Sequence, residues 1–284
     1  MKINQITIIG LGLIGGSLGL ALKDRDKNLK VIGVAKKTYQ VEKAKAMGAI
    51  DEGFLDYIQG VVDSDLIIIA TPVSTIKDIV LKIIPFLKPS CIITDTGSTK
   101  NEITTSLSFL SRKDVSFVGS HPIAGSHLSG IEVAKKDLFR YNPCIITPLP
   151  VTSSEALAVV KGFWELLEAK VVFLTPLEHD EIISSISHLP HILSSALVNI
   201  IVSLTKKFPY IPEIITPSFK DITRIAASNP YMWSDIVLSN REMLLESLSL
   251  FREKISYWEK IIKEQDKIKI EEEFMSSKKW KEEN

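Results

Sequence analysis

The five histidines of the sequence all lie between residues 121 and 191. Two of them belong to ISSISHLPHILSSAL (183–197), whose apolar spacing predicts a helix. That helix carries a polar stripe with spacings of 4, 3 and 4 residues, namely Ser184, His188, His191 and Ser195, with Ser187 beside it. Because each buried polar group without a partner costs roughly 1–3 kcal/mol, we expect the stripe to face a wet cleft.

Two other interpretations of the stripe stay open. His188 and His191 could share a metal ion, but no acidic residue lies on the same stripe, so we predict no metal site. One of the two histidines could instead be satisfied inside a core. Pro190 cannot donate a hydrogen bond to the carbonyl of Ile186 one turn back, which predicts a kink in the helix.

His121 stands where a predicted strand (115–120) ends, within GSHPIAGS. Ser98 follows another predicted strand (91–95), within DTGSTK. Open α/β sheets bind ligands at the carboxyl ends of their strands, and neighbouring strand ends would bring these two side chains together.

Arg224 closes the segment FKDITR at the start of a predicted helical region (217–227). A guanidinium fork suits bidentate binding of a carboxylate. The same side chain could equally form a structural salt bridge, and the segment alone does not decide between the two.

A glycine-rich turn, GLGLIG, joins the first predicted strand to the helix that follows it. Gly10 permits the tight turn, Gly12 lets the backbone approach a pyrophosphate, and Gly15 lets the helix pack closely on the strand. Leu13 and Ile14 open the helix, whose free N–H groups favour an anion. This context predicts a dinucleotide site, and a glycine-rich turn without a ligand is the alternative.

The end of the second predicted strand indicates which dinucleotide binds. An Asp or Glu at this place would hold the ribose 2′-hydroxyl of NAD. The sequence has Ala35 there, followed by Lys36 and Lys37. Two ammonium groups would attract the 2′-phosphate that a carboxylate would repel, so we predict that NADP is favoured over NAD. The lysines could instead only solvate a turn.

The elements that must position these residues alternate between strand and helix through the first half of the chain. Predicted strands cover 6–10, 30–35, 65–71, 91–95, 115–120, 143–148 and 170–176. Beyond them the pattern is helical, over about 178–206, 217–227 and 231–265, and it ends in a charged tail that we expect to be a solvated helix end or frayed. We predict an α/β fold with a Rossmann-type, doubly wound, mostly parallel sheet at 1–174, followed by an all-helical domain at 175–284 for substrate binding and dimerisation.

Composition narrows the class of protein. The 284 residues are 45% hydrophobic and include 34 Lys and Arg against 34 Asp and Glu, so no net positive charge attracts nucleic acid or an anionic membrane. We find no apolar run near the ~20 residues that a membrane span needs and no signal peptide. The two cysteines form no CxxC motif, which is typical of a reducing compartment and predicts a cytoplasmic protein. The long apolar helical part predicts a homodimer.

Taken together, the motifs resemble those of the prephenate/arogenate dehydrogenase family of tyrosine biosynthesis. The motifs GLGLIGGSL, ATP (70–72), TDTGSTK, HPIAGSHLSGIEVA, TPLEHD, SHLPH and FKDITRIA occur in the family's order and at its spacing. The resemblance covers residues 1 to about 260. It implies an NAD(P)-dependent oxidation in which hydride leaves C4 of a cyclohexadiene ring, CO2 leaves C1, and the ring becomes a phenol.

The resemblance also implies roles for single residues. His121 matches the catalytic histidine that accepts a hydrogen bond from the C4 hydroxyl, and Ser98 matches the serine that orients both groups. Arg224 matches the arginine that binds a substrate carboxylate. The other matching positions are expected to contact substrate (Ser187, His191 and, with a less defined role, His188) or cofactor (Thr71 and Pro72).

The sequence departs from the family pattern in ITPSFKDITR, where Pro217 and Ser218 replace glycines. From the 284 residues we expect neither the regulatory ACT module nor the chorismate mutase domain of some relatives. His191 resembles prephenate-accepting members, so prephenate is favoured and arogenate is the alternative. We expect His121 and Arg224 to meet across one pocket, with the reactive carbon of the cofactor at its floor.

Two rival functions remain. A β-hydroxyacid-type dehydrogenase would use a lysine on the helical domain, where this sequence offers Ser and His. A dinucleotide sensor without activity would have no use for His121, Ser98 and Arg224.

Overall fold

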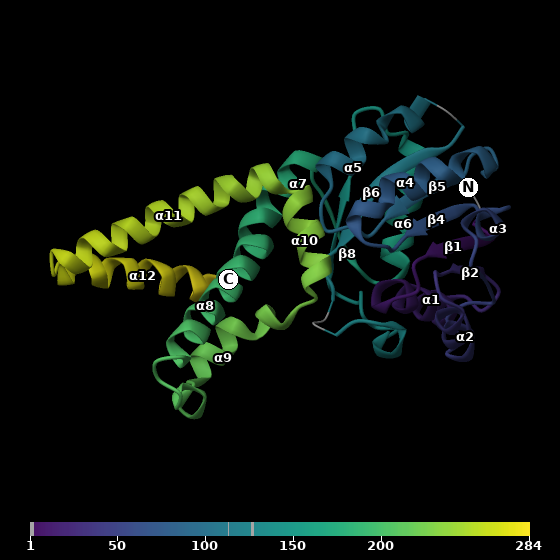
Figure 1. Ribbon diagram of the computed structural model, residues 1–284. Helices are drawn as coiled ribbons and strands as arrows, with labels where there is room; N and C mark the ends of the chain where they lie inside the picture. The colour runs from purple at the N-terminus through teal and green to yellow at the C-terminus, as the bar shows by residue number, and fades with distance from the viewer. Residues whose placement is uncertain (1–2, 113, 126–127) are drawn as a thin grey trace. The chain divides into compact units, whose positions relative to one another are not determined.

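The structure is a computed structural model that describes residues 3–112, 114–125 and 128–284 (Figure 1). His127 lies outside the described residues. The strands of the described chain are β1 (Gln5–Ile9), β2 (Lys30–Val34), β3 (Glu52–Phe54), β4 (Leu66–Ile69), β5 (Ile92–Asp95), β6 (Ser116–Pro122), β7 (Pro143–Thr147) and β8 (Lys170–Phe173). The helices between them are α1 (Leu13–Arg25), α2 (Thr38–Ala46), α3 (Tyr57–Val61), α4 (Val73–Ile83), α5 (Asn101–Ser106) and α6 (Ser154–Leu166).

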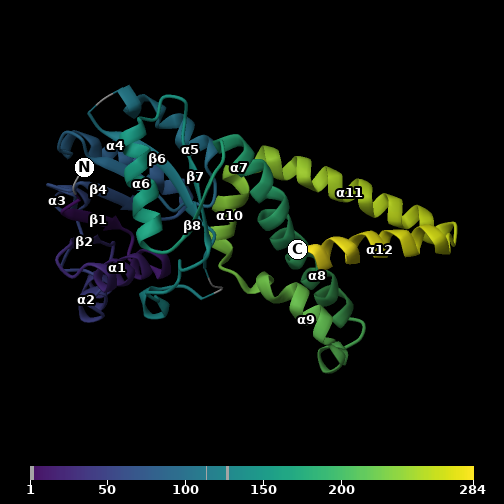
Figure 2. The same ribbon diagram turned by 180° about the vertical axis from the view of Figure 1, so that it is seen from behind.

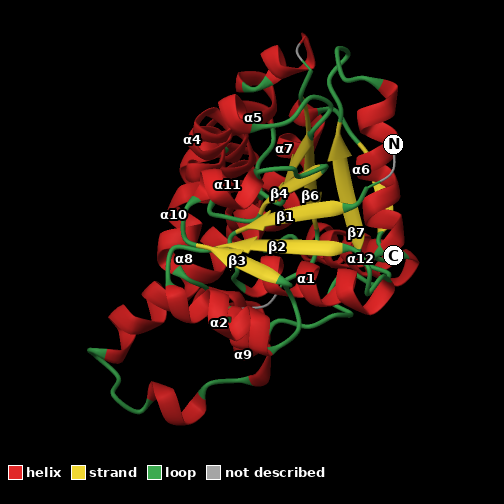
Figure 3. Ribbon diagram, turned by 90° about the vertical axis from the view of Figure 1, so that its right-hand side faces the viewer, coloured by secondary structure: helices red, strands yellow, loops and turns green. Residues whose placement is uncertain are grey.

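All eight strands form one sheet in the order β3-β2-β1-β4-β5-β6-β7-β8. The strands from β3 to β6 are parallel, whereas β7 runs antiparallel to β6 and β8 runs parallel to β7 (Figure 3). Because β1 lies between β2 and β4, the winding reverses there, and such a switch point opens a crevice at the carboxyl ends of the strands. The predicted mostly parallel Rossmann-type sheet is confirmed. β3 and α3 are additional elements that the sequence pattern did not reveal.

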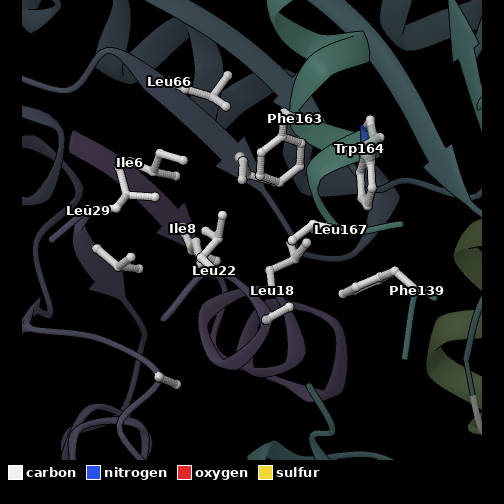
Figure 4. Packing of buried hydrophobic residues seen from close by; sticks show 14 of the residues in the cluster. Ile6, Ile8, Leu18, Leu22, Leu29, Leu66, Phe139, Phe163, Trp164 and Leu167 are labelled. Atoms are coloured by element: carbon white, nitrogen blue, oxygen red, sulfur yellow. The ribbon is translucent and has the colours of Figure 1, made fainter. Parts of the chain in front are cut away.

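Apolar layers cover both faces of the sheet. In β4, Leu66 and Ile68 belong to one core cluster, whereas Ile67 and Ile69 belong to the other. The alternation follows from the two-residue period of a strand and explains why a parallel strand buried on both faces is continuously apolar. Figure 4 shows the first cluster, in which side chains of β1 pack with those of α1 and α6.

The helices after the sheet are α7 (Pro176–Ile183), α8 (Leu189–Thr205), α9 (Pro217–Thr223), α10 (Pro230–Ser239), α11 (Arg241–Lys263) and α12 (Lys267–Glu283). α7 begins with a capping box, in which Thr175 and Glu178 satisfy each other's backbone N–H groups. A π-helical turn, Ser184–His188, joins α7 to α8 (Figure 2). It ends two residues before Pro190, where the sequence predicted a kink, so the structure has a widened turn at that place.

The predicted helix at 231–265 is wrong as a single element. It breaks at Asn240, which separates α10 from α11. The charged tail forms α12, a full helix without a buried residue. By compactness the chain divides into Met1–Asn240 and Arg241–Asn284, and the functional boundary at 174/175 stays a prediction.

α10 lies in the same compact unit as the sheet because it packs on α4. Ser74 Oγ donates to Asp235 Oδ2 at 2.7 Å, and Ile236 is buried in the second core cluster. α11 and α12 form the other unit, joined by a Lys254–Glu273 ion pair and by contact between the Trp258 and Phe274 rings.

The expectation that no apolar run approaches the length of a membrane span is wrong. Pro176–Thr205 forms a continuous helical stretch of 30 residues with a mean hydropathy of 1.4 in its most apolar window, and only 11% of that window is buried. By length and composition alone it could cross a membrane. Its first half is nevertheless built into the fold, because His179, Asp180 and His188 are buried and hydrogen-bonded there.

Candidate active site

The glycine-rich turn between β1 and α1 has the geometry that a dinucleotide requires. Gly10 has φ of 102°, and a Cβ there would lie 2.4 Å from the carbonyl oxygen of Ala70. A Cβ on Gly15 would lie 1.8 Å from the carbonyl oxygen of Gly10. A Cβ on Gly12, in contrast, would meet no protein atom within 4 Å. The turn is therefore closed toward the sheet and open at Gly12, where a pyrophosphate would approach.

A cavity of about 420 Å³ lies in front of this turn. Seven predicted site residues line it, namely Gly12, Leu13, Ile14, Thr71, Pro72, Ser98 and His121. Loop residues Ala124, Gly125 and Leu128–Gly130 line another part of its wall, and Ser228, Asn229, Met232 and Ile236 bring in the start of α10. The sheet switch point and the helical region thus enclose one space.

The ribose end of the predicted cofactor site lies at the end of β2. The Ala35 side chain is buried and its N–H donates to the carbonyl of Phe54, whereas Lys36 and Lys37 are exposed. Lys37 precedes α2, with its Nζ 5.9 Å from the centre of the Tyr39 ring. Both lysine side chains thus lie at the exposed edge between β2 and α2.

His121 reaches the cavity from β6, and Ser98 reaches it from the loop after β5. The two strands are neighbours in the sheet, so the predicted proximity of these residues follows from their pairing. Both side chains are half-buried. No hydrogen bond joins them among the described contacts.

A buried ion pair fixes the strand ends behind these two residues. Lys100 Nζ contacts Asp95 Oδ2, and neither side chain is exposed. Asp95 also accepts the N–H groups of Gly97 at 2.8 Å and Ser120 at 3.1 Å. One carboxylate therefore ties the loop that carries Ser98 to the strand that carries His121. Sequence reasoning missed this role, although both residues stand in the motif TDTGSTK.

His121 has a second histidine beside it that sequence reasoning did not place. Its Nδ1 lies 2.8 Å from Nε2 of His179, and His179 Nδ1 lies 2.7 Å from Oδ1 of Asp180. Burial, with the positive charge of Lys100 and the neighbouring imidazole, holds the pKa of His121 well below 6.5. Burial also lowers the pKa of His179. Both rings are therefore neutral at pH 7. The only sequence signal was the HD pair in TPLEHD.

The predicted polar stripe does not face a wet cleft along its whole length. Ser184 and His188 are buried, and His188 Nδ1 lies 3.2 Å from the amide nitrogen of Asn240. Burial lowers the pKa of His188 to about 4. For His188 the core interpretation is the right one. Ser187 is half-buried, and Ser195 is exposed.

His191 lies toward a second cavity of about 260 Å³. Its ring stacks on Trp233 with 3.5 Å between ring centres, a partner that the sequence did not suggest. Burial and the positive charge of Arg224 lower the pKa of His191 to about 4. Ser195 and Ser228 also line this cavity, and Ser228 lines the larger one as well.

Arg224 lies beside this second cavity, in the 3₁₀ turn that follows α9. It is exposed and forms no salt bridge within the described part of the chain. His121 lines the larger cavity, whereas Arg224 lines neither of these two cavities; its neighbours Ile225 and Ala226 line the second one, and Ser228 lines both. The meeting of His121 and Arg224 across one pocket stays a prediction.

Comparison with known proteins agrees with this geometry. The chain matches the family model described as prephenate dehydrogenase, nucleotide-binding domain, over residues 18–173. It matches the prephenate dehydrogenase dimerization domain over residues 175–276. The chain is 36% identical to the prephenate dehydrogenase of Bacillus subtilis over 86% of its own length and 66% of that protein. It is 35% identical to that of Lactococcus lactis over 97% of its own length and 76% of that protein.

Solved structures extend the likeness over the whole chain. Prephenate dehydrogenase from A. aeolicus, solved with hydroxyphenyl propionate and NAD+, superposes with a TM-score of 0.89, at 29% identity and with 100% and 99% of the two chains covered. Synechocystis arogenate dehydrogenase superposes with a TM-score of 0.81, at 28% identity and with 98% and 99% covered.

Proposed function

The chain belongs to the prephenate dehydrogenase family, and we propose that it oxidatively decarboxylates prephenate to 4-hydroxyphenylpyruvate with transfer of hydride to NAD(P). The position of His121 carries this proposal. A neutral imidazole, held at a strand end, faces the same cavity as the dinucleotide turn and Ser98. That arrangement suits removal of a hydroxyl proton while hydride leaves the same carbon.

The residues present fit a dinucleotide. The space at Gly12 admits a pyrophosphate, the free N–H groups at the start of α1 favour its charge, and Thr71 and Pro72 extend the wall toward His121. A bound oxidised dinucleotide would supply the acceptor for the hydride. The chain itself orients the ring of the substrate, excludes water, and accepts the hydroxyl proton at His121, with Ser98 placed to hold that hydroxyl.

We assign a substrate carboxylate to Arg224, with Ser187 and His191 on the same side. Support comes from the exposed guanidinium beside the cavity that His191 lines. A small dianion in a protein without net charge needs such a local cation. His191 is neutral at pH 7 and can donate a hydrogen bond to a keto acid side chain. Arogenate, which differs only in that side chain, is the second candidate substrate.

A preference for NADP over NAD is part of the proposal. Lys36 and Lys37 are exposed at the end of β2, and no carboxylate occupies position 35. A 2′-phosphate would gain two nearby positive charges, and NAD would lose nothing by their presence. We therefore expect NADP to bind more tightly and NAD to remain usable.

The proposal includes a homodimer formed through the helical part at 175–284, with the dinucleotide domain at 1–174. Apolar side chains along the helices are exposed in the single chain, among them Leu177, Ile200, Leu250 and Phe274. Many exposed apolar side chains of this kind support a protein–protein interface. Cytoplasmic location is proposed because both cysteines are free and buried.

A matrix of assays tests the function. Purified protein is mixed with prephenate or arogenate and with NADP or NAD, and the absorbance of reduced nicotinamide is followed together with the release of CO2. Rapid turnover of prephenate with NADP is expected. Turnover of arogenate alone would transfer the assignment to the second candidate, and binding of the dinucleotide without any turnover would overturn it in favour of a sensor. Turnover of a β-hydroxyacid instead would also reject it.

A further inference from the structure

His179 is a buried histidine that the reaction as described does not use. It stands between His121 and Asp180, with hydrogen-bond distances of 2.8 Å and 2.7 Å. We propose that His179 and Asp180 are positioning residues, which hold His121 as the tautomer with its proton on Nδ1 and so make Nε2 the acceptor for the substrate. His121, His179 and Asp180 are termed the His–His–Asp triad. The inference rests on the proposed function for its catalytic consequence only.

The direction of each hydrogen bond follows from Asp180. Its Oδ1 accepts the backbone N–H of Lys100 at 2.7 Å, and its Oδ2 accepts that of Asn101 at 2.9 Å. A carboxylate that receives these donors can only accept, so His179 donates through Nδ1. A neutral imidazole has one donor and one acceptor, so His179 Nε2 accepts and His121 Nδ1 donates. The unprotonated nitrogen of His121 is then Nε2.

The surroundings keep both rings neutral, which the assignment requires. His121 has His179, Lys100 and His188 around it, and these groups disfavour a further positive charge on its ring. For His179, burial lowers the pKa most, the carboxylates of Asp180 and Asp95 favour a proton on the ring, and the charge of Lys100 disfavours it, so that the pKa is lowered on balance. Neither ring gains a second proton near pH 7, so the order of donors and acceptors stays unique.

The triad is held by three separate segments of the chain. Asp180 of α7 accepts N–H groups at the start of α5, which fixes its carboxylate. The amide of Asn240 donates to the carbonyl of Asp180 at 2.8 Å and so fixes its backbone. His121 comes from β6. Such long-range anchoring gives the imidazole one orientation before any ligand arrives.

The triad also has a role during the reaction. The substrate O–H bond breaks as its proton moves to His121 Nε2, and the C4–H electron pair leaves as hydride. The C1–carboxylate bond then breaks as CO2 departs, its electron pair enters the ring, and the phenolate oxygen takes the proton back from Nε2. While His121 carries the extra proton, the negative charge of Asp180 stabilises it through His179.

Nitrogen NMR on the intact protein tests the tautomer directly. Protein labelled with ¹⁵N histidine is measured at neutral pH, and the signals of residue 121 are identified by their loss in His121→Asn. We expect a protonated Nδ1 and an unprotonated Nε2 for both His121 and His179. This is the tautomer that free histidine disfavours, so the observation would not arise by default. A proton on Nε2 of His121 would overturn the proposal.

Substitution at position 179 tests the consequence. His179→Phe keeps the ring and removes both nitrogens, so we expect His121 to lose its single tautomer and kcat to fall about 10²-fold with little change in KM. His179→Gln, which restores an acceptor at the same reach, should recover part of kcat and of the Nδ1–H signal. Thr104→Val is the matched control, because its buried hydroxyl has no partner. It should leave both readouts unchanged.

The outcomes separate this inference from the proposed function. If NMR shows the predicted tautomer but prephenate is not turned over, the triad is retained and the proposed function is rejected. If prephenate is turned over but NMR shows the other tautomer, the function is retained and the triad is rejected. If His179→Phe did not fold, the spectrum of the unmodified protein would still decide. Equal kcat in His179→Phe and the unmodified protein would remove the positioning role.

Discussion

The two polar regions of the candidate site are built in opposite ways. Around His121, side chains are buried and joined by a series of short hydrogen bonds to the backbone. Around Arg224, the guanidinium is exposed, and its neighbour His191 is positioned by stacking on Trp233. The reacting group is thus oriented by folding itself, whereas the group assigned to the substrate carboxylate is left for the ligand to organise.

The difference follows from what each region must do. A general base is effective only while its lone pair points at the substrate proton. Rigid hydrogen bonds that hold this orientation therefore outweigh the free-energy cost of burying the polar groups that form them. An arginine that binds the substrate carboxylate must exchange water for substrate at each turnover. An exposed guanidinium can do so because water solvates its charge when no substrate is bound, which avoids the free-energy cost of an unpaired buried charge. Changes near His121 should therefore affect turnover and folding, and changes near Arg224 should affect binding.

The largest effect is expected at His121. His121→Asn keeps a polar side chain of similar reach but removes the basic nitrogen, so kcat should fall about 10³-fold. Affinity for the dinucleotide should stay within about twofold because the glycine turn is untouched. Steady-state kinetics and a fluorescence titration with NADPH measure the two. Loss of folding in circular dichroism would show instead that the residue is structural.

The next effect is on stability and concerns His188. Its pKa is about 4 in the folded protein against about 6.5 when unfolded. The unfolded chain therefore binds the proton first as pH falls, so stability is complete above pH 6.5, declines between 6.5 and about 4, and is constant below that range for this residue. The difference between the folded and unfolded pKa values corresponds to a loss of about 3 kcal/mol in the free energy of unfolding. Urea unfolding at several pH values measures this loss.

His188→Gln serves as the comparison, because glutamine can still accept from Asn240 but does not titrate. The variant should lose part of the decline between pH 6.5 and 4, while His121, His179 and His191, whose pKa values are also lowered, contribute the remainder. An identical pH profile in both proteins would contradict the buried neutral state of His188.

The two regions also differ in how well the sequence predicts them. The turn at Gly10, the cavity position of His121 and its neighbourhood to Ser98 follow from local patterns and from strand order, which a sequence carries directly. The His121–His179–Asp180 contacts depend on packing between β6, α7 and the start of α5, residues far apart along the chain. For the same reason, the burial of His188 against Asn240 could not be inferred from a helical stripe.

A smaller effect is expected at Arg224. Arg224→Ala should raise the apparent KM for prephenate about 30-fold and change kcat little, because a charge-assisted hydrogen bond contributes about 2 kcal/mol. Lys206→Ala removes an exposed cation elsewhere on the helical region and is the matched control. Should both variants have the KM of the unmodified protein, the carboxylate would be bound by another group.

The smallest effect is expected at Ala35, in a region that resembles the surroundings of Arg224 in exposing its charges. Ala35→Asp would place a carboxylate where the 2′-phosphate of NADP is predicted to lie, with Lys36 and Lys37 beside it. Position 35 itself is buried, so circular dichroism must show that the variant folds. Repulsion of the phosphate beside the exposed lysines amounts to about 1 kcal/mol, so the ratio of kcat/KM for NADP over NAD should fall about fivefold. The Michaelis constant for prephenate should not change, since the substitution acts only on the cofactor.

Lys36→Ala combined with Lys37→Ala should lower the same ratio without a new carboxylate. If neither protein changed the ratio, the lysines would only solvate the turn between β2 and α2, and binding at this edge would depend on the backbone alone.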